Sequence, residues 1–316
     1  QVQIALDRCE FEYQRNSRIK NTLDRLVEFR DLLSHSGNSS KASFRETRIL
    51  EIANVSIGHT LSPQGICHNQ DGDLLVASYE NHQIYTYSPE GNCQFHFGGW
   101  GCAPEKLQYP NNLAIDSKGS IYVIEEKNQL IKKFDQEGTY LFQFGLGQLG
   151  MIFSLSIDSQ DNIWAADPEH NRIIIFDPNG AEVRTISGEN QSTSLKQPVS
   201  VYCLENGEYL VGDKSESLLK HFDAQDNIIN RANKAAWEVD EIYFMARHPK
   251  HGIYGSDFWN SQIVHFSNKL EVQSVYHKPG KRAGQLGKVG GLSIFNDQLA
   301  VANFDGGKVQ IFDLSS

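Results

Sequence analysis

Cysteine is scarce in this chain of 316 residues, and its spacing excludes familiar sites. Five cysteines are present, and no two of them form the C-x-x-C pair typical of zinc and redox motifs. Only Cys93 and Cys102 lie close together in the sequence, on either side of a Gly-rich turn. The sequence leaves open whether these two residues form a disulfide.

Long apolar runs are also absent. The longest surrounds residues 173–175 and is far shorter than the roughly 20 residues that a membrane-spanning helix needs. Hydrophobic residues make up 39% and charged residues 22%, so the composition predicts a soluble globular protein. The chain begins with Gln1 rather than Met, which leaves open an upstream segment and both a secreted and a cytoplasmic location.

Signatures of common enzyme classes are missing too. The sequence contains no Gly-Lys-Ser/Thr phosphate loop, no G-x-S-x-G nucleophile elbow and no H-E-x-x-H zinc helix. A G-x-G-x-x-G string occurs at Gly145, Gly147 and Gly150, but a dinucleotide site needs a helix directly after it to hold the pyrophosphate. Residues 151–158 alternate like a strand instead, so these glycines are predicted to form a turn between repeats.

Positive charge is in the minority. The formal net charge is −10, and residues 1–48 carry nine Lys and Arg against seven Asp and Glu, which leaves 20 against 32 in the rest. Nucleic-acid binders gain most of their affinity by neutralising phosphates with Lys and Arg. Residues 49–316 therefore carry a net negative charge. This charge argues against RNA or DNA as the main ligand.

A repeat of 42 to 47 residues runs through the sequence. It is marked by an aromatic residue that ends an apolar segment, at Tyr87, Phe134, Phe176, Phe222, Phe266 and Phe312. In four repeats Asp follows this aromatic directly. Each repeat contains an apolar strand, an Asp/Asn/Gly turn, a second strand, a polar turn and a third strand, as in residues 155–158, 163–167 and 172–177.

Repeats of this length, built from four short strands, are typical of propeller blades. The sequence therefore predicts an all-β, six-bladed β-propeller over residues 48–316. The last repeat stops at its third strand, and an additional strand, residues 48–55, precedes the first complete repeat. We expect that strand to complete the last blade, because an open ring would leave two sheet edges unpaired.

Several segments resemble the NHL-repeat family, whose name comes from an Asn-His-Leu signature. Residues 81–84, Asn-His-Gln-Ile, match that signature, and residues 63–65 and 97–101 are similar to the Gly-rich linker of the family. The resemblance covers residues 49–316 and is strongest in the first three repeats. It implies an NHL-like propeller, a fold that hosts binding scaffolds, lyases and lactonases.

Residues 1–47 differ in character from the repeats. Four apolar residues fall on one face at helical spacing, and they are Ile19, Leu23, Leu26 and Leu33. This pattern predicts an amphipathic α-helical extension, followed by a linker rich in Ser and Gly. Its apolar stripe is expected to dock on the propeller or a partner, or to form a coiled coil that makes an oligomer.

Alignment of the repeats reveals a ring of polar residues at the ends of the second strands. One blade after another contributes Ser78, Glu125, Asp167, Asp213, Asp257 and Asn303. These side chains are expected to cap the amides of the following turn. The alternative is a Ca²⁺ or Zn²⁺ site in the central channel, for which Glu125, Asp167, Asp213, Asp257 and His248 are the candidate ligands.

Aromatic residues follow this ring in three blades, where polar turn residues are the rule. They are Tyr79, Phe258, Trp259 and Phe304. Aromatic side chains on exposed loops often anchor protein interfaces. The sequence therefore favours a non-catalytic scaffold that binds a protein or peptide without a cofactor. The alternative is a metal-dependent lyase or hydrolase, similar to lactonases or peptidyl-amidoglycolate lyases, that acts in the channel.

Overall fold

The computed structural model describes residues 61–187, 195–214, 217–233, 239–280 and 284–314. Within these residues, 23 strands form six antiparallel sheets, and in every sheet the strands follow one another in sequence order. The predicted helical extension, residues 1–47, and the predicted closing strand, residues 48–55, lie outside the described residues. No helix in the described part of the chain is long and apolar enough to span a membrane.

The strands of the first three sheets, or blades, have the following bounds. Blade 1 contains β1 (Pro63–His68), β2 (Leu74–Ser78), β3 (Gln83–Tyr87) and β4 (Cys93–Gly98). Blade 2 contains β5 (Pro110–Ile115), β6 (Ile121–Glu125), β7 (Leu130–Phe134) and β8 (Tyr140–Phe144). Blade 3 contains β9 (Leu155–Ile157), β10 (Ile163–Asp167), β11 (Arg172–Phe176) and β12 (Glu182–Ser187).

The other three blades repeat this order. Blade 4 contains β13 (Pro198–Cys203), β14 (Tyr209–Asp213), β15 (Ser217–Phe222) and β16 (Ile228–Asn233). Blade 5 contains β17 (Phe244–His248), β18 (Gly252–Asp257), β19 (Gln262–Phe266) and β20 (Val272–His277). Blade 6 has three strands within the described residues, β21 (Val289–Phe295), β22 (Gln298–Asn303) and β23 (Lys308–Asp313).

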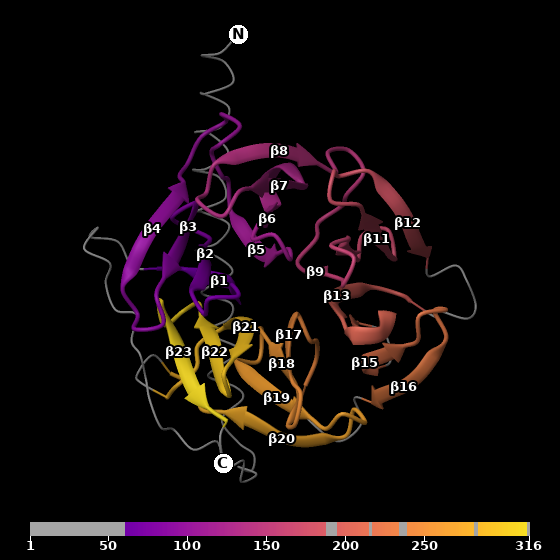
Figure 1. Cartoon of the computed structure of the whole chain (residues 1–316). Coiled ribbons are helices and arrows are strands. Elements are labelled where there is room, and N and C mark those ends of the chain that lie inside the picture. Colours follow the sequence, from indigo (N-terminus) through magenta and orange to yellow (C-terminus); the bar gives the residue numbers. More distant parts are fainter. Residues whose placement is uncertain (1–60, 188–194, 215–216, 234–238, 281–283, 315–316) are drawn as a thin grey trace, which may run out of the picture. The chain divides into compact units, whose positions relative to one another are not determined.

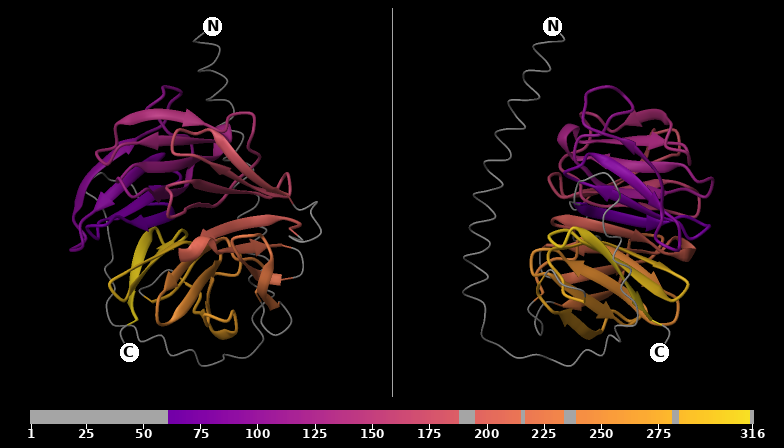
Figure 2. Two further views of the ribbon diagram at one scale, coloured as in Figure 1. Left: turned by 45° about the vertical axis from the view of Figure 1, so that its right-hand side comes forward. Right: turned by 90° about the vertical axis from the view of Figure 1, so that its left-hand side faces the viewer.

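The six blades form a closed ring around a central channel (Figure 1), which Figure 2 shows from two further sides. The first strand of each blade is innermost and contacts the first strand of the next, and β21 contacts β1. The predicted six-bladed propeller is therefore confirmed. We call the end at which second strands lead into third strands the upper face, and the end that carries the other two hairpins of each blade the lower face.

The hydrophobic core lies between the blades rather than within them. Six clusters of buried side chains each combine residues of two neighbouring blades, and one of them joins blade 6 to blade 1. The six aromatic residues that mark the repeat end or nearly end the third strands, and all are almost inaccessible to solvent. Because each blade buries its faces against its neighbours, no blade is expected to be stable alone.

Acidic and amide side chains fix the hairpins of the lower face. Six such residues begin a hairpin turn, and they are Asn69, Asp116, Asp135, Asp158, Asp177 and Asp223. In each of them Oδ1 accepts hydrogen bonds from the amides two and four residues later, at 2.7–3.1 Å. This explains three of the four Phe-Asp pairs, because the Asp after Phe134, Phe176 or Phe222 supplies the turn.

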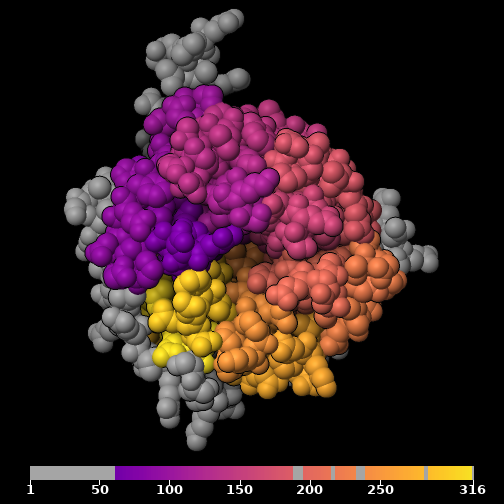
Figure 3. All heavy atoms as spheres, in the orientation of Figure 1, coloured from indigo at the N-terminus to yellow at the C-terminus, as the bar shows by residue number. Residues whose placement is uncertain are grey.

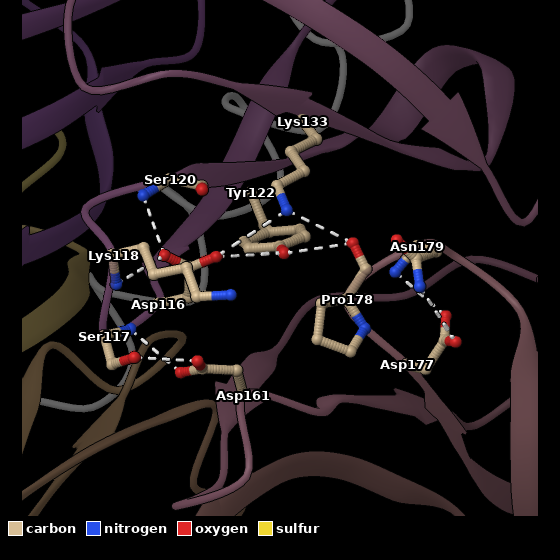
Figure 4. Close-up of polar contacts among 10 residues, drawn as sticks. All are labelled: Asp116, Ser117, Lys118, Ser120, Tyr122, Lys133, Asp161, Asp177, Pro178 and Asn179. Atoms are coloured by element: carbon tan, nitrogen blue, oxygen red, sulfur yellow. Dashed lines mark hydrogen bonds and ion pairs between the residues drawn. The ribbon is translucent and has the colours of Figure 1, made fainter.

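One of these turns also joins two blades (Figure 4). Asp116 of blade 2 accepts a hydrogen bond from the hydroxyl of Tyr122 at 3.1 Å. Ser117 donates to Asp161 of blade 3 through its amide, at 2.9 Å, and through its hydroxyl, at 2.7 Å. The ammonium group of Lys133 donates to the carbonyl of Pro178 in blade 3 at 3.1 Å. Some of the acidic residues that give the propeller its negative charge therefore have a structural role.

Glycine permits a close backbone approach where blade 6 meets blade 1. A Cβ atom added to Gly290 would lie 2.3 Å from the carbonyl oxygen of Gln64, and one added to Gly291 would lie 2.6 Å from the amide nitrogen of Ile66. Both contacts are with the backbone of β1, which cannot move aside as a flexible side chain could. A side chain at either position would therefore force these two strands apart.

We expect the substitution Gly290→Ala to lower the free energy of unfolding by about 1–3 kcal/mol, because it overpacks this junction. Urea unfolding followed by tryptophan fluorescence measures the effect. Gly101→Ala is the matched control, since its added methyl meets only the side chain of Lys106. Equal unfolding midpoints for the two variants would contradict the prediction.

Candidate functional site

The predicted ring of polar residues exists, with one member at the end of the second strand of each blade. Its members are Ser78, Glu125, Asp167, Asp213, Asp257 and Asn303, and each is at most 2% exposed. The ring therefore lies beneath the upper face rather than on it.

Hydrogen bonds to the backbone occupy most of this ring. In five blades the side chain accepts an amide hydrogen from the linker that enters the same blade, at 2.8–3.4 Å, and the donors are Ser62, Gly150, Lys196, Asp240 and Gly287. Three members, Asp167, Asp257 and Asn303, also accept from the amide three residues later. The interpretation of these three as turn caps is confirmed.

Cations on the third strands neutralise three of the carboxylates. Lys132 lies 2.7 Å from Glu125, Lys220 lies 2.9 Å from Asp213, and Arg172 lies 3.2 Å from Asp167. Asp257 has no such cation among the described residues, and burial raises the pKa of its carboxyl group. These carboxylates are thus committed to partners within their own blades.

His248 lies far from the acidic candidates. It ends β17 at the lower face, where its partner across the hairpin is Gly252, whereas Asp257 lies at the other end of that hairpin. Its Nε2 lies 2.7 Å from Asp297 of blade 6, and its Nδ1 accepts hydrogen bonds from the amides of Lys250 and His251. His248 therefore ties two blades together.

The candidate metal ligands are therefore not brought together. In the described part of the chain, no three His, Cys, Asp or Glu side chains are placed to hold a metal ion. A channel zinc needs three protein ligands and an open position, and the described donors do not fit that requirement. Cys93 and Cys102 are both free thiols.

We expect Asp213→Asn to lower the free energy of unfolding by about 3–5 kcal/mol, because it leaves the ammonium group of Lys220 buried without its counter-charge. The double variant Asp213→Leu/Lys220→Met removes both charges and is expected to recover most of the loss. Chemical denaturation with and without EDTA measures both effects. A wild-type midpoint that EDTA lowers would indicate a bound metal and contradict the structural role.

The four aromatic residues singled out in the sequence do come together. Tyr79 lies 6.2 Å from Phe304, Phe304 lies 6.0 Å from Phe258, and Phe258 lies 5.2 Å from Trp259, measured between ring centroids. These distances are typical of aromatic pairs in contact. Trp259 is the most open of them, with 40% of its surface exposed.

The linkers between blades extend this group with residues that the sequence analysis did not select. Tyr109 lies 4.9 Å from Tyr79, Trp100 lies 5.9 Å from Tyr109, Tyr243 lies 6.3 Å from Phe258, and Phe153 lies 5.7 Å from Tyr243. We call all eight residues the upper aromatic cluster: Tyr79, Trp100, Tyr109, Phe153, Tyr243, Phe258, Trp259 and Phe304. Phe153 and Tyr243 belong to linkers of blades 3 and 5, so the cluster reaches across the mouth of the channel.

Polar groups surround the rings of the cluster. The Tyr79 hydroxyl donates to Glu126 at 2.9 Å, and burial together with this carboxylate raises the pKa of Tyr79. The ammonium group of Lys288 lies 5.5 Å from the centre of the Trp259 ring and 5.9 Å from that of Phe258. The cluster thus combines apolar area with hydrogen-bonding groups and a positive charge.

The signature histidine of the first repeat supports the cluster from below. His82 is 5% exposed and lies against the rings of Trp100 and Tyr109, at 4.7 and 4.6 Å. Its Nδ1 accepts a hydrogen bond from the amide of Tyr109 at 3.1 Å. Burial lowers the pKa of His82 from 6.5 to about 4, so the ring is neutral and can accept that bond near neutral pH.

No protein-family model matches the sequence. Among curated proteins, Protein brain tumor from Drosophila melanogaster is 30% identical to this chain over 128 residues. The aligned region covers 40% of this chain and 12% of that protein. NHL repeat-containing protein 3 from Homo sapiens is 26% identical to this chain over 149 residues. That aligned region covers 43% of this chain and 42% of the human protein. The chain is a β-propeller of the NHL-repeat family.

Two further matches cover most of this NHL propeller. Peptidylglycine alpha-amidating monooxygenase from Rattus norvegicus is 25% identical over 337 residues, which is 91% of this chain and 32% of that protein. A solved streptogramin B lyase has a TM-score of 0.60 and 13% identity, over 87% of this chain and 90% of that one. That structure shows the fold alone, and the chain spans less than half of each curated relative named here.

We expect the NHL propeller to lose stability as the pH falls from 6.5 toward 4, in part through His82. The unfolded chain binds a proton there that the folded chain excludes, so the free energy of unfolding decreases in this range. His82→Asn keeps a hydrogen-bond acceptor, tolerates the left-handed backbone (φ 59) and does not titrate. The free energy of unfolding, measured at pH 7 and at pH 5, should decrease less in the variant than in the wild-type chain. An equal decrease in both would refute the role of His82.

Proposed function

We propose that this NHL propeller is a non-catalytic scaffold that binds a protein or peptide through the upper aromatic cluster. The observation that supports this most is the convergence of eight aromatic side chains, drawn from turns and linkers of five of the six blades, into one connected group. Conventional turns use Asn, Asp, Gly or Ser at such positions. Aromatic anchors at the centre of a contact surface commonly provide much of the affinity for a partner.

The chemistry of the cluster favours an amino-acid partner over RNA. Aromatic rings also stack with unpaired bases, but an RNA site needs Lys and Arg to neutralise the backbone. Residues 49–316 carry twelve more acidic than basic residues, and Lys288 already lies over two rings. A partner that inserts apolar side chains among the rings and pairs an acidic group with Lys288 fits this surface.

The channel enzyme is the less favoured function. The candidate carboxylates are bonded to amides and to cations of their own blades, and His248 lies at the opposite face. The matches to a rat amidating enzyme and to bacterial lyase structures extend over most of the chain, but they support the shared fold without the donor set of a metal site.

A second contact surface is part of the proposal. The predicted apolar stripe of the extension, with Ile19, Leu23, Leu26 and Leu33, would hold a partner helix or a second copy of the chain. Deletion of residues 1–47 separates the two surfaces. An oligomer that persists in the deletion variant, measured by light scattering, would argue against this role of the stripe.

We expect Phe258→Ala/Trp259→Ala to weaken binding of a partner by about 30-fold or more, the effect of losing an interface hot spot. Partners are first captured by crosslinking in cells, identified by mass spectrometry and purified, and their affinity is then measured by calorimetry. Leu141→Ala/Ile229→Ala is the matched control, because these side chains are 47% and 53% exposed on outer strands.

The contrast between the two double variants decides the proposal. A partner that binds the cluster variant and the control variant equally well does not use the upper face. Retention of RNA by the wild-type chain at physiological salt, lost in the cluster variant, would show that the rings serve nucleotide bases instead.

A further inference from the structure

The central channel contains a cavity that the scaffold function does not use. Its volume is about 280 Å³, close to the lower end of the range of small-molecule sites. All six innermost strands line it, together with Ser154, which directly precedes β9. The space-filling view shows the hollow that they surround at the centre of the ring (Figure 3).

The charge of this cavity differs from that of the chain as a whole. Among its described lining residues Arg247 is the one permanent cation, and no Asp or Glu is present. Its half-buried side chain has no ion pair or hydrogen bond with any acidic group of the described residues. Arg247 therefore carries the one permanent charge of the described cavity lining, in a chain that has ten more acidic than basic residues.

Four other buried or half-buried basic side chains have counter-charges. Lys132, Lys220 and Arg172 each pair with a strand-end carboxylate of their own blade, and Lys133 lies 3.7 Å from Asp116. A cation that is partly removed from water is costly unless an anion or hydrogen-bond acceptors compensate it. The absence of an acid beside Arg247, within the described residues, distinguishes this site from the structural ion pairs.

Two hydroxyl-bearing side chains, Ser156 and Tyr202, line the cavity together with Arg247. The hydroxyl of Ser156 accepts a hydrogen bond from the amide of Cys203 at 2.9 Å, and the positive charge of Arg247 acts on the hydroxyl of Tyr202. An oxygen that already accepts a backbone hydrogen bond keeps its own proton to donate. A guanidinium group and two O–H donors form a suitable set for a carboxylate.

The remaining lining is apolar and includes Ile66, Leu113, Ile157 and Leu292. We propose that the channel binds a small aliphatic molecule with one carboxylate, which pairs with Arg247 while its apolar body lies among these side chains. A single negative charge matches the single arginine, whereas a phosphate dianion would keep an uncompensated charge. The carboxylate could come from a free short-chain acid or from the C-terminal residue of a peptide.

The probes for this site are hexanoate and N-acetyl-leucine, which represent the two sources, and hexanamide, which has no charge. Titrations of the full chain, followed by ligand-observed NMR, are expected to show saturable binding of at least one acid. Hexanamide is expected to bind at least tenfold more weakly than hexanoate if the free acid is the ligand. No saturable binding of either acid would overturn the proposal.

Substitution of the arginine gives the second test. We expect Arg247→Gln to weaken binding of the acid at least tenfold, whereas Arg231→Gln, which removes the same charge from an exposed position on outer strand β16, leaves it unchanged. Equal weakening by both variants would indicate general electrostatics and refute the site. If Arg247→Gln does not fold, the comparison of hexanoate with hexanamide on the wild-type chain still decides. Phe258→Ala/Trp259→Ala should bind the acid normally, which separates this site from the upper aromatic cluster.

Discussion

The structure depends on burial between neighbouring blades. Each sheet is a thin layer with an apolar surface on both sides, and six hydrophobic clusters, one at every junction, remove those surfaces from water. Such contacts stabilise only when the next blade is present, so the ring gains its full stability only when the last blade meets the first. At that last junction the glycines of β21 lie close against the backbone of β1.

This constraint also determines where charge is placed. Asp and Asn side chains hold the hairpins of the lower face, and carboxylates beneath the upper face hold the linkers that enter each blade. Many of the acidic residues that dominate the net charge are therefore structural. The polar ring resembles a cation site in the sequence because turn capping and metal binding both use carboxylate and amide oxygens.

The fold could be predicted from the sequence because its determinants are periodic. The buried aromatic at each third strand and the turn-forming Asp after it recur in step with the blades, and Gly145, Gly147 and Gly150 lie between β8 and β9, as predicted. Four members of the upper aromatic cluster could also be found, since each follows a second strand. Trp100, Tyr109, Phe153 and Tyr243 could not, because linkers vary in length and their convergence is a property of the ring. For Arg247 there was no sequence signal at all, since its environment comes from six strands that are far apart in the chain.

The position of the upper aromatic cluster relative to the ends of the ring has a further consequence. Its central members come from blades 5, 6, 1 and the linker to blade 2, so the contact between Tyr79 and Phe304 crosses the junction between the last and the first blade. A ligand held by these rings would bridge the junction between the first and the last repeat of the sequence. Binding would then stabilise the closed ring, and a higher concentration of the partner would make opening at this junction rarer.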